Sequence, residues 1–151
     1  MKHILNTVRL LITHDNYILF QKDRYEGYYF FQGGKIEFAE TLQDAARREL
    51  LEELAIGPER ISMITPVAVG EGVFKYQGRI FHDMSIFCTC EISELTSKAD
   101  PISPEEGTVF KWLPMDNLVN YDIRPAQSIN LLPEWLSANK PRTFFFSNID
   151  V

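Results

Sequence analysis

Residues 34–56 read GKIEFAETLQDAARRELLEELAI, a stretch that indicates a loop leading into an amphipathic helix. Thr41, with Asp44 three residues on, resembles a capping pair, because the threonine oxygen can accept a hydrogen bond from a free backbone N–H of the first turn. Apolar side chains then recur every four residues, as expected of a helix that packs on a sheet: Leu42, Ala46, Leu50 and Leu54. The stretch therefore predicts a helix over residues 41–54, ended by Gly57-Pro58.

Three glutamates share one face of this predicted helix, because Glu49, Glu52 and Glu53 stand at positions i, i+3 and i+4. Like charges at these spacings repel each other, so the cluster calls for a counter-charge. Carboxylate oxygens on a rigid element are ligands that Mg²⁺ or Mn²⁺ prefers, with water and phosphate oxygens in the remaining positions. The same string is also typical of a solvated helix face, so these glutamates alone leave both readings open.

The whole chain has the length and composition of one globular domain. Its 151 residues are 45% hydrophobic and 24% charged, which excludes a disordered or fibrous chain. The formal net charge is −6 and the sequence pI is about 5.1, unlike the basic surface of a protein that binds a nucleic-acid polymer or an anionic membrane. A polyanionic substrate would need a cation between itself and this protein.

The cysteines and the hydropathy pattern favour a cytoplasmic protein. Cys88 and Cys90 lie two apart in an apolar run, where an extended chain points both side chains to the same face, so we expect core packing rather than a disulfide. No apolar stretch approaches the ~18–20 residues of a membrane span, and the N-terminus does not resemble a signal peptide. We therefore expect no membrane partner.

Runs of β-branched, aliphatic and aromatic residues outside the helix predict a sheet. We expect a hairpin of residues 4–13 and 17–22, an aromatic strand over residues 28–31, long strands over 61–74 and 80–92, and a further strand over 108–113. Residues 125–136 predict a second helix that Pro133 breaks or kinks. The structure of the tail, residues 140–151, is left open, but its Phe144-Phe145-Phe146 run points to association, such as a homodimer.

The complete register of residues 34–56 resembles the Nudix box, G-x5-E-x7-R-E-U-x-E-E-x-G-U, in which U is a bulky aliphatic residue. Every named position matches except Ala55, which stands where the family usually has glycine. Alanine is costly in the left-handed conformation that often ends a helix, so we expect a displaced helix end, with Gly57 taking over the turn and the metal ligands intact. The resemblance implies a single Nudix domain over residues 1–151.

The Nudix resemblance implies an α/β fold, an α/β/α sandwich around a mixed sheet. Glu49, Glu52 and Glu53 match the family's catalytic, metal-binding glutamates, and Gly34 matches the residue whose carbonyl oxygen can join them. The family also has a pair that braces the loop against the helix, and the residues that match it here are Glu40 and Arg48. An Arg–carboxylate fork suits that task, because its geometry is more rigid than that of a lysine pair.

By the same resemblance the chain is a hydrolase that uses Mg²⁺, or Mn²⁺ in its place, to cleave a pyrophosphate linkage. Its substrate is a small-molecule phosphoanhydride, a nucleoside diphosphate linked to another group, as in nucleotides or nucleotide sugars. Family members take the general base from the box or from a later loop, where Glu106 is the first candidate and Glu105 the second. The alternative is a Nudix-fold protein that binds nucleotides or regulates without cleaving them, which has no need to keep a like-charge cluster.

The residues that bind the substrate are harder to predict than the metal site. Tyr28 and Phe30 could stack a base, and Arg24 stands near the same predicted strand edge, where it could contact phosphate. Alternate members of an aromatic run must face the core, however, and strand-end cations are common on surfaces. We therefore expect a substrate site of Arg24, Tyr28 and Phe30, with core packing as the competing interpretation of the aromatic residues.

Overall fold

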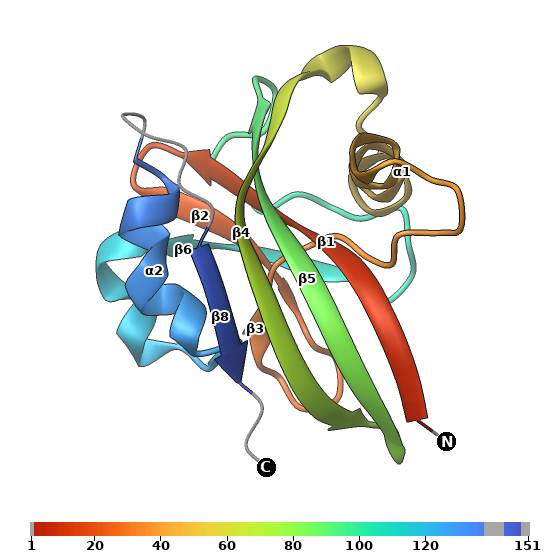
Figure 1. The fold of residues 1–151 in the computed structure, drawn as a ribbon. Coiled ribbons are helices and arrows are strands. Elements are labelled where there is room, and N and C mark those ends of the chain that lie inside the picture. The colour runs from red at the N-terminus through yellow and green to blue at the C-terminus, as the bar shows by residue number, and fades with distance from the viewer. Residues whose placement is uncertain (1, 138–143, 149–151) are drawn as a thin grey trace.

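A computed structural model describes residues 2–137 and 144–148 of the chain. Eight strands form one mixed sheet in the order β7-β3-β2-β1-β5-β4-β8, with β6 paired to β2 (Figure 1). The strands are β1 (Lys2–His14), β2 (Tyr17–Lys22), β3 (Tyr29–Phe30), β4 (Ile61–Tyr76), β5 (Arg79–Ile92), β6 (Val109–Pro114), β7 (Ile123–Arg124) and β8 (Phe144–Asn148). The helices are α1 (Leu42–Leu54) and α2 (Gln127–Trp135), with short 3-10 helices at Pro58–Arg60 and Met115–Asn120.

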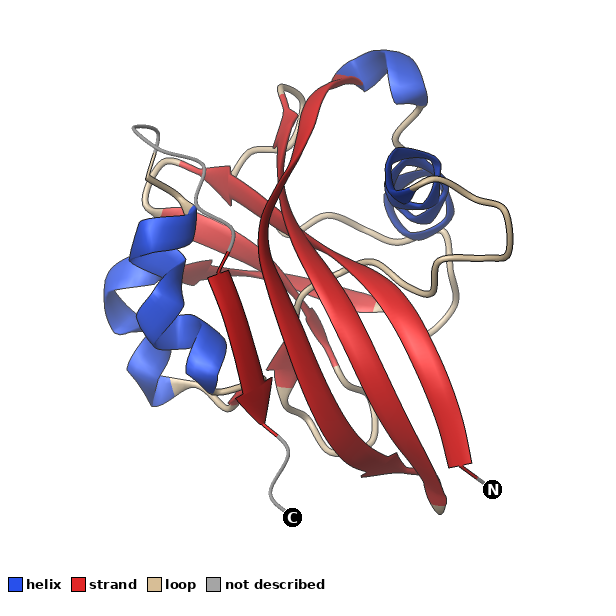
Figure 2. Cartoon of the chain, in the orientation of Figure 1, coloured by secondary structure: helices blue, strands red, loops and turns tan. Residues whose placement is uncertain are grey.

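Helices α1 and α2 lie on opposite sides of the sheet (Figure 2), and each covers its own core. Under α1, the side chains of Ala46 and Leu50 pack with Leu10 of β1. Under α2, Trp135 packs with Phe87 of β5, their ring centroids 4.9 Å apart. Alternate residues of the central strands supply the two cores, as the period of a strand requires. The predicted α/β/α sandwich around a mixed sheet is confirmed.

Most elements predicted from the sequence are present. Helix α1 begins after Thr41, whose Oγ1 accepts a hydrogen bond from the Asp44 N–H at 3.1 Å. The hairpin β1–β2, the strands β4, β5 and β6, and a helix that contains Pro133 all lie where they were expected. Both cysteines are free thiols buried in the core under α1, which confirms their packing role.

The aromatic strand is shorter than predicted. Residues 28–31 were expected to form it, but β3 covers only Tyr29–Phe30. Beyond it the chain runs beside β1 outside any regular strand: the carbonyl groups of Gln32 and Gly34 accept hydrogen bonds from the N–H groups of Leu10 and Val8, both at 2.9 Å. This pairing brings the start of the 34–56 stretch against the middle of the sheet.

The expected displacement of the helix end is wrong. Ala55 itself adopts the left-handed conformation, with φ 55° and ψ 32°, whereas Gly57 is extended. The N–H groups of Ala55 and Ile56 donate to the carbonyls of Leu51 and Leu50, so the last turn of α1 is closed at the position where glycine is usual. Alanine tolerates this at a cost of roughly 1 kcal/mol, and the ends of the helix stay in register with the box.

Part of the tail joins the sheet, because β8 runs parallel to β4 with Phe144 opposite Ala68. The other tail residues, 140–143 and 149–151, lie outside the described part of the chain. The homodimer and the cytoplasmic location stay predictions. None of the helices described is long and apolar enough to cross a bilayer.

Candidate active site

A carboxylate fork ties α1 to the loop that precedes it. Arg48 Nε donates to Glu40 Oε1 at 2.8 Å, and Arg48 Nη2 donates to Glu40 Oε2 at 3.0 Å. Arg48 Nη2 also donates to the carbonyl of Lys35 at 2.8 Å, so one guanidinium binds both ends of the loop. The bond from Arg48 lowers the pKa of Glu40 to about 2. The two residues predicted to brace this loop are thus brought together.

The side chain of Glu49 is buried against Gly34. A Cβ at position 34 would lie 2.3 Å from Glu49 Oε1, so the missing side chain of Gly34 leaves room for this carboxylate. Arg48 Nη1 donates to the same oxygen at 2.7 Å. Burial raises the pKa of Glu49 in spite of that partner. The Gly34 carbonyl accepts a hydrogen bond from Val8 N–H and keeps a second lone pair.

Glu53 lies one turn further along the same face and is only 8% exposed. Its Oε2 accepts a hydrogen bond from the N–H of Gly33 at 3.1 Å. The pKa of Glu53 is raised to about 7, chiefly by burial and also by the charge of Glu49, while the Gly33 hydrogen bond and the Arg9 charge oppose them. A buried carboxylate with one hydrogen-bond donor and a like charge beside it is a group that a cation would stabilise.

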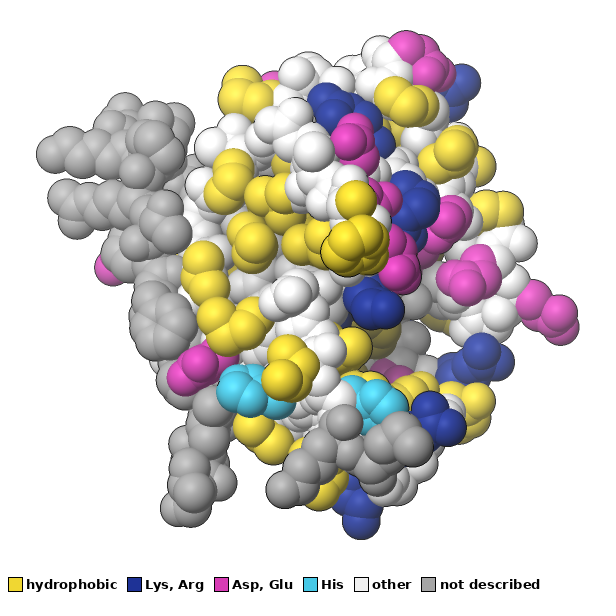
Figure 3. All heavy atoms as spheres, turned by 45° about the vertical axis from the view of Figure 1, so that its right-hand side comes forward, with side chains coloured by type: hydrophobic (Ala, Val, Ile, Leu, Met, Phe, Trp, Pro, Cys, Tyr) yellow, Lys and Arg dark blue, Asp and Glu magenta, His cyan; other side chains and the backbone are white. Residues whose placement is uncertain are grey.

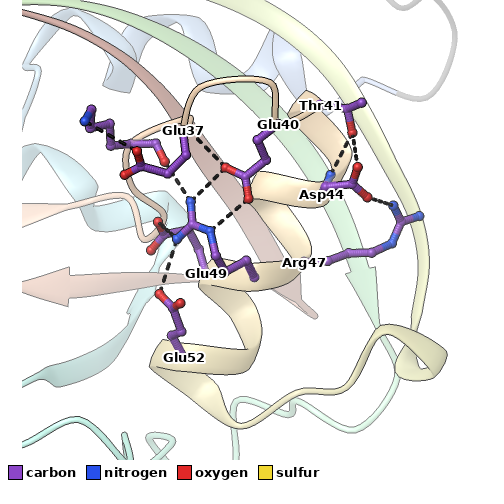
Figure 4. Close-up of polar contacts among 9 residues, drawn as sticks. Glu37, Glu40, Thr41, Asp44, Arg47, Glu49 and Glu52 are labelled. Carbon is purple, nitrogen blue, oxygen red and sulfur yellow. Dashed lines mark hydrogen bonds and ion pairs between the residues drawn. The ribbon is translucent and has the colours of Figure 1, made fainter.

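Glu52 completes the glutamate face, which we define as Glu49, Glu52 and Glu53. Its side chain is more than half exposed, and its Oε2 accepts a hydrogen bond from Arg48 Nη1 at 3.3 Å. Glu40, Glu49 and Glu52 approach one another in Figure 4 because each is bound to this guanidinium. Acidic and basic side chains gather accordingly on the side of the molecule that carries α1 (Figure 3).

The donor set of the glutamate face fits Mg²⁺ or Mn²⁺, which bind hard oxygen ligands. Two of the three carboxylates are buried, and the space beside Gly34 admits one of them. Within residues 2–137 and 144–148, no three Asp, Glu, His or Cys side chains are gathered closely enough to bind one ion. In this structure Arg48 Nη1 is the shared partner of Glu49 and Glu52.

The loop before β6 approaches the glutamate face through Glu105. The charge of Glu105 raises the pKa of Glu53, and Glu105 Oε2 accepts a hydrogen bond from Thr108 Oγ1 at 3.1 Å. Glu106 is exposed and makes none of the hydrogen bonds or ion pairs found in the described part of the chain. Of the two loop glutamates, Glu105 is the one whose charge acts on the pKa of Glu53.

A cavity of about 560 Å³ lies between β3 and β4, within the size range of small-molecule sites. Tyr28 and Phe30, two of the predicted substrate residues, line it, with ring centroids 5.9 Å apart. The Arg124 guanidinium lies 4.0 Å from the centre of the Tyr28 ring. Arg24 does not line the cavity and stands beside Gly107.

Sequence reasoning missed several cavity residues, chiefly Arg9, Phe74 and Arg124. Of these three, only Arg9 could have been noticed in the sequence, because it is a charged residue inside the apolar run VRLLI of β1. Phe74 and Arg124 come from β4 and β7, whose closeness depends on how the sheet is assembled.

Residues 4–134 match the model of the NUDIX domain, so the chain belongs to the Nudix family. This confirms the resemblance found in residues 34–56. Membership places the chain among the Nudix hydrolases, which act on phosphoanhydride bonds.

Solved structures share the fold across most of the chain. The solution structure of the E. coli ORF135 protein is 25% identical, covers 91% of this chain and 94% of its own, and has a TM-score of 0.57. An ADP-ribose pyrophosphatase from Streptococcus suis is 16% identical, with coverage of 93% and 98% and a TM-score of 0.63. The C. elegans Ap4A hydrolase is also 16% identical, with coverage of 87% and 96% and a TM-score of 0.58.

Proposed function

We propose that the protein is a Mg²⁺-dependent hydrolase that cleaves a pyrophosphate linkage in a nucleoside diphosphate joined to another group. The observation that carries the proposal is the glutamate face, in which Glu49 and Glu53 are buried next to each other and burial raises the pKa of both carboxyl groups. Two structural neighbours support the substrate class, because they are named for ADP-ribose and Ap4A.

In this proposal Glu49, Glu52 and Glu53 hold Mg²⁺, the Gly34 carbonyl is a further ligand, and Mn²⁺ can substitute. The bound ion supplies charge neutralisation at the phosphate oxygens and lowers the pKa of a bound water. Arg48 and Glu40 keep the loop against α1, so that Gly34 stays beside Glu49. Without such a cation, a chain of net charge −6 would repel its anionic substrate.

The proton of the attacking water needs an acceptor, and we propose a glutamate of the loop before β6 for this role. Glu106 is the candidate from the sequence, and Glu105 joins it because its charge acts on Glu53. Glu105→Gln and Glu106→Gln, compared in the same assay, separate the two. Loss of the base lowers kcat by about 10²–10⁴-fold, whereas the other substitution leaves kcat within a few-fold of the parent.

The proposed activity is tested with ADP-ribose, nucleotide sugars, dinucleoside polyphosphates and nucleoside triphosphates, each with Mg²⁺ and after chelation. We expect turnover of one class that requires the metal and is lost in Glu53→Gln. Glu134→Gln, an exposed glutamate of α2, is the matched control and should keep full activity. Nucleotide binding without any turnover would contradict the proposal and favour a non-catalytic Nudix protein.

A further inference from the structure

Four polar side chains interrupt the sheet face that carries the core under α2. Strands β1 and β5 run parallel, with Thr7 opposite Ser85 and Arg9 opposite Phe87. Because side chains alternate along a strand, the four polar residues share this face with the core residues that follow them. They are Thr7, Arg9, Asp83 and Ser85.

Hydroxyl groups hold Asp83 in a fixed position. The side chain is buried, at 6% exposure for the residue, and its Oδ1 accepts a hydrogen bond from Thr7 Oγ1 at 3.0 Å. Its Oδ2 accepts from Ser85 Oγ at 2.7 Å. Burying a carboxylate is costly unless donors and a counter-charge surround it. The cation beside it is Arg9, whose Nη2 lies 3.8 Å from Asp83 Oδ2.

Arg9, by contrast, is loosely bound. Its Nη1 donates to the Gly33 carbonyl at a long 3.4 Å, and its Nη2 is too far from Asp83 for a good hydrogen bond. A guanidinium has five N–H donors, so most of those on Arg9 are unused by the residues that the structure describes. The side chain lines the 560 Å³ cavity and is about one-fifth exposed.

Arg9 also lies between the aromatic cavity and the glutamate face. The peptide unit at Gly33 joins the two, because its N–H donates to Glu53 while its carbonyl accepts from Arg9. An anion held at Arg9 would therefore reach from the cavity toward the glutamates.

The other charges of the cavity leave Arg9 as its best anion ligand. Arg124 is paired with Glu26 at 3.0 Å and with Asp122 at 3.1 Å, and Lys75 lies on an exposed stretch of β4. Four acidic residues line the same cavity and oppose an anion elsewhere in it: Asp23, Glu26, Glu71 and Asp83.

We propose that Arg9 binds the diphosphate of the substrate and that Asp83 positions its guanidinium. The diphosphate then lies between the glutamate face and the aromatic cavity, where the rings of Tyr28 and Phe30 contact the nucleoside. This inference rests on the proposed function for its substrate class, but it concerns binding, which can be measured without turnover.

The test compares ADP, GDP, CDP and UDP with their nucleosides, by calorimetry, in Mg²⁺ and after chelation. Arg9→Gln should lower the affinity for nucleoside diphosphates by about 10- to 100-fold. It should change the affinity for nucleosides by less than about two-fold, because only the phosphates contact the charge that is removed. Arg9→Lys keeps the charge but not the forked guanidinium, so its diphosphate affinity should lie between those of the parent and Arg9→Gln. Arg47→Gln removes an equal charge from α1 outside the cavity and should leave both affinities unchanged.

Asp83→Asn tests positioning. It keeps one acceptor, the amide oxygen, for the Thr7 hydroxyl but removes the charge beside Arg9, so the preference for the diphosphate over the nucleoside should fall by about 3- to 10-fold while the fold is retained. A purely structural role would lower both affinities together or neither. An unchanged preference in both Arg9→Gln and Asp83→Asn overturns the proposal, as does a parent protein that binds no nucleoside diphosphate.

Failure of this inference and of the hydrolase proposal can be told apart. If turnover depends on the metal, but KM and diphosphate affinity are unchanged in Arg9→Gln, the role of Arg9 in binding is rejected and the hydrolase proposal is retained. If no substrate of the panel is turned over, but Arg9→Gln still weakens diphosphate binding, the hydrolase proposal is rejected and the role of Arg9 in binding is retained.

Discussion

The two halves of the proposed site are built in different ways. The glutamate face and its brace come from residues 34–56, one continuous loop and helix. The cavity comes from β1, β3, β4, β5 and β7, which are far apart in the sequence. The half that would hold the metal is therefore fixed by local spacing, while the half that would recognise the substrate depends on tertiary packing.

The two halves also differ in the surroundings of their buried carboxylates. Asp83 accepts hydrogen bonds from two hydroxyl groups and has Arg9 beside it. Glu53 accepts one hydrogen bond, from Gly33, and lies near two other glutamates, Glu49 and Glu105. Satisfied polar groups rigidify a structure, whereas an under-compensated carboxylate is a site where a ligand cation contributes most. Asp83 therefore suits positioning, and Glu53 suits metal binding.

The largest effect expected outside the glutamates themselves comes from Gly34→Ala. The added methyl group must displace the Glu49 carboxylate, which lies 2.3 Å from the position of the new Cβ. A displacement of about 1 Å in a catalytic group costs about 10²-fold in kcat/KM. Gly78→Ala, which meets nothing within 4 Å at the tip of the β4–β5 hairpin, should keep full activity. A Gly34→Ala enzyme as active as the parent would contradict the claim that the space beside this glycine positions Glu49 for metal binding.

The next effect is on stability and concerns Leu50, which anchors α1 to its core at 1% exposure. Leu50→Ala should lower the free energy of unfolding by about 3 kcal/mol, since it leaves a cavity in that core. Leu51→Ala, at a neighbouring position that is 51% exposed, should cost under about 1 kcal/mol in the same urea titration. Equal losses would show that α1 is not held by this face.

Glu53→Gln should stabilise the metal-free protein in a pH-dependent way. Because folding raises the pKa of Glu53 from 4.5 to about 7, the protonated form is favoured in the folded state. Its contribution is fully present below about pH 4.5 and is lost as the pH rises through 7. The variant should therefore match the parent near pH 4.5 and exceed it by about 2–3 kcal/mol at pH 8.

The control for this stability effect is Glu52→Gln, since the Glu52 side chain is more than half exposed. Thermal unfolding from pH 4.5 to 8 in the presence of a chelator measures both variants. A Glu53→Gln protein that gains nothing at pH 8 would show that burial does not destabilise this carboxylate. Mg²⁺ should reverse the order, because it stabilises the parent and not the variant.

The smallest effect is expected at the end of α1. Ala55→Gly should raise the free energy of unfolding by about 0.5–1 kcal/mol, because Ala55 has φ 55° and glycine adopts this conformation without strain. Ala126→Gly, at a residue with φ −60°, should bring no gain. If urea unfolding shows no difference between them, the left-handed end of α1 is not strained.

The local half of the molecule could be predicted from the sequence because its signals are short-range. Thr41 and the four-residue spacing of Leu50 and Leu54 define α1, and the register of the glutamates follows from the helical period. Ala55 was misjudged because alanine was expected to avoid a backbone angle that the closing hydrogen bonds of the helix impose.

The cavity half could not be predicted, because it depends on the parallel pairing of β1 with β5. That pairing places Asp83 near Arg9, although the two are 74 positions apart in the sequence. Arg24 illustrates the same limit: it lies four residues from Tyr28 in the sequence, yet it stands beside Gly107 and is not among the residues that line the cavity with Tyr28. Strand registers of this kind are set by the whole fold, so only the assembled sheet shows which charges meet.

The most direct test of the account is a Mn²⁺ titration of the metal-free protein, followed by electron paramagnetic resonance. Mn²⁺ prefers the same oxygen ligands as Mg²⁺, and its free ion has a distinct signal. We predict binding to the parent and to Glu134→Gln, and at least ~10-fold weaker binding to Glu53→Gln, because one of three carboxylate ligands is lost. Equal Mn²⁺ affinity in the parent and in a variant with Glu49, Glu52 and Glu53 all changed to Gln would contradict a metal site on this helix face.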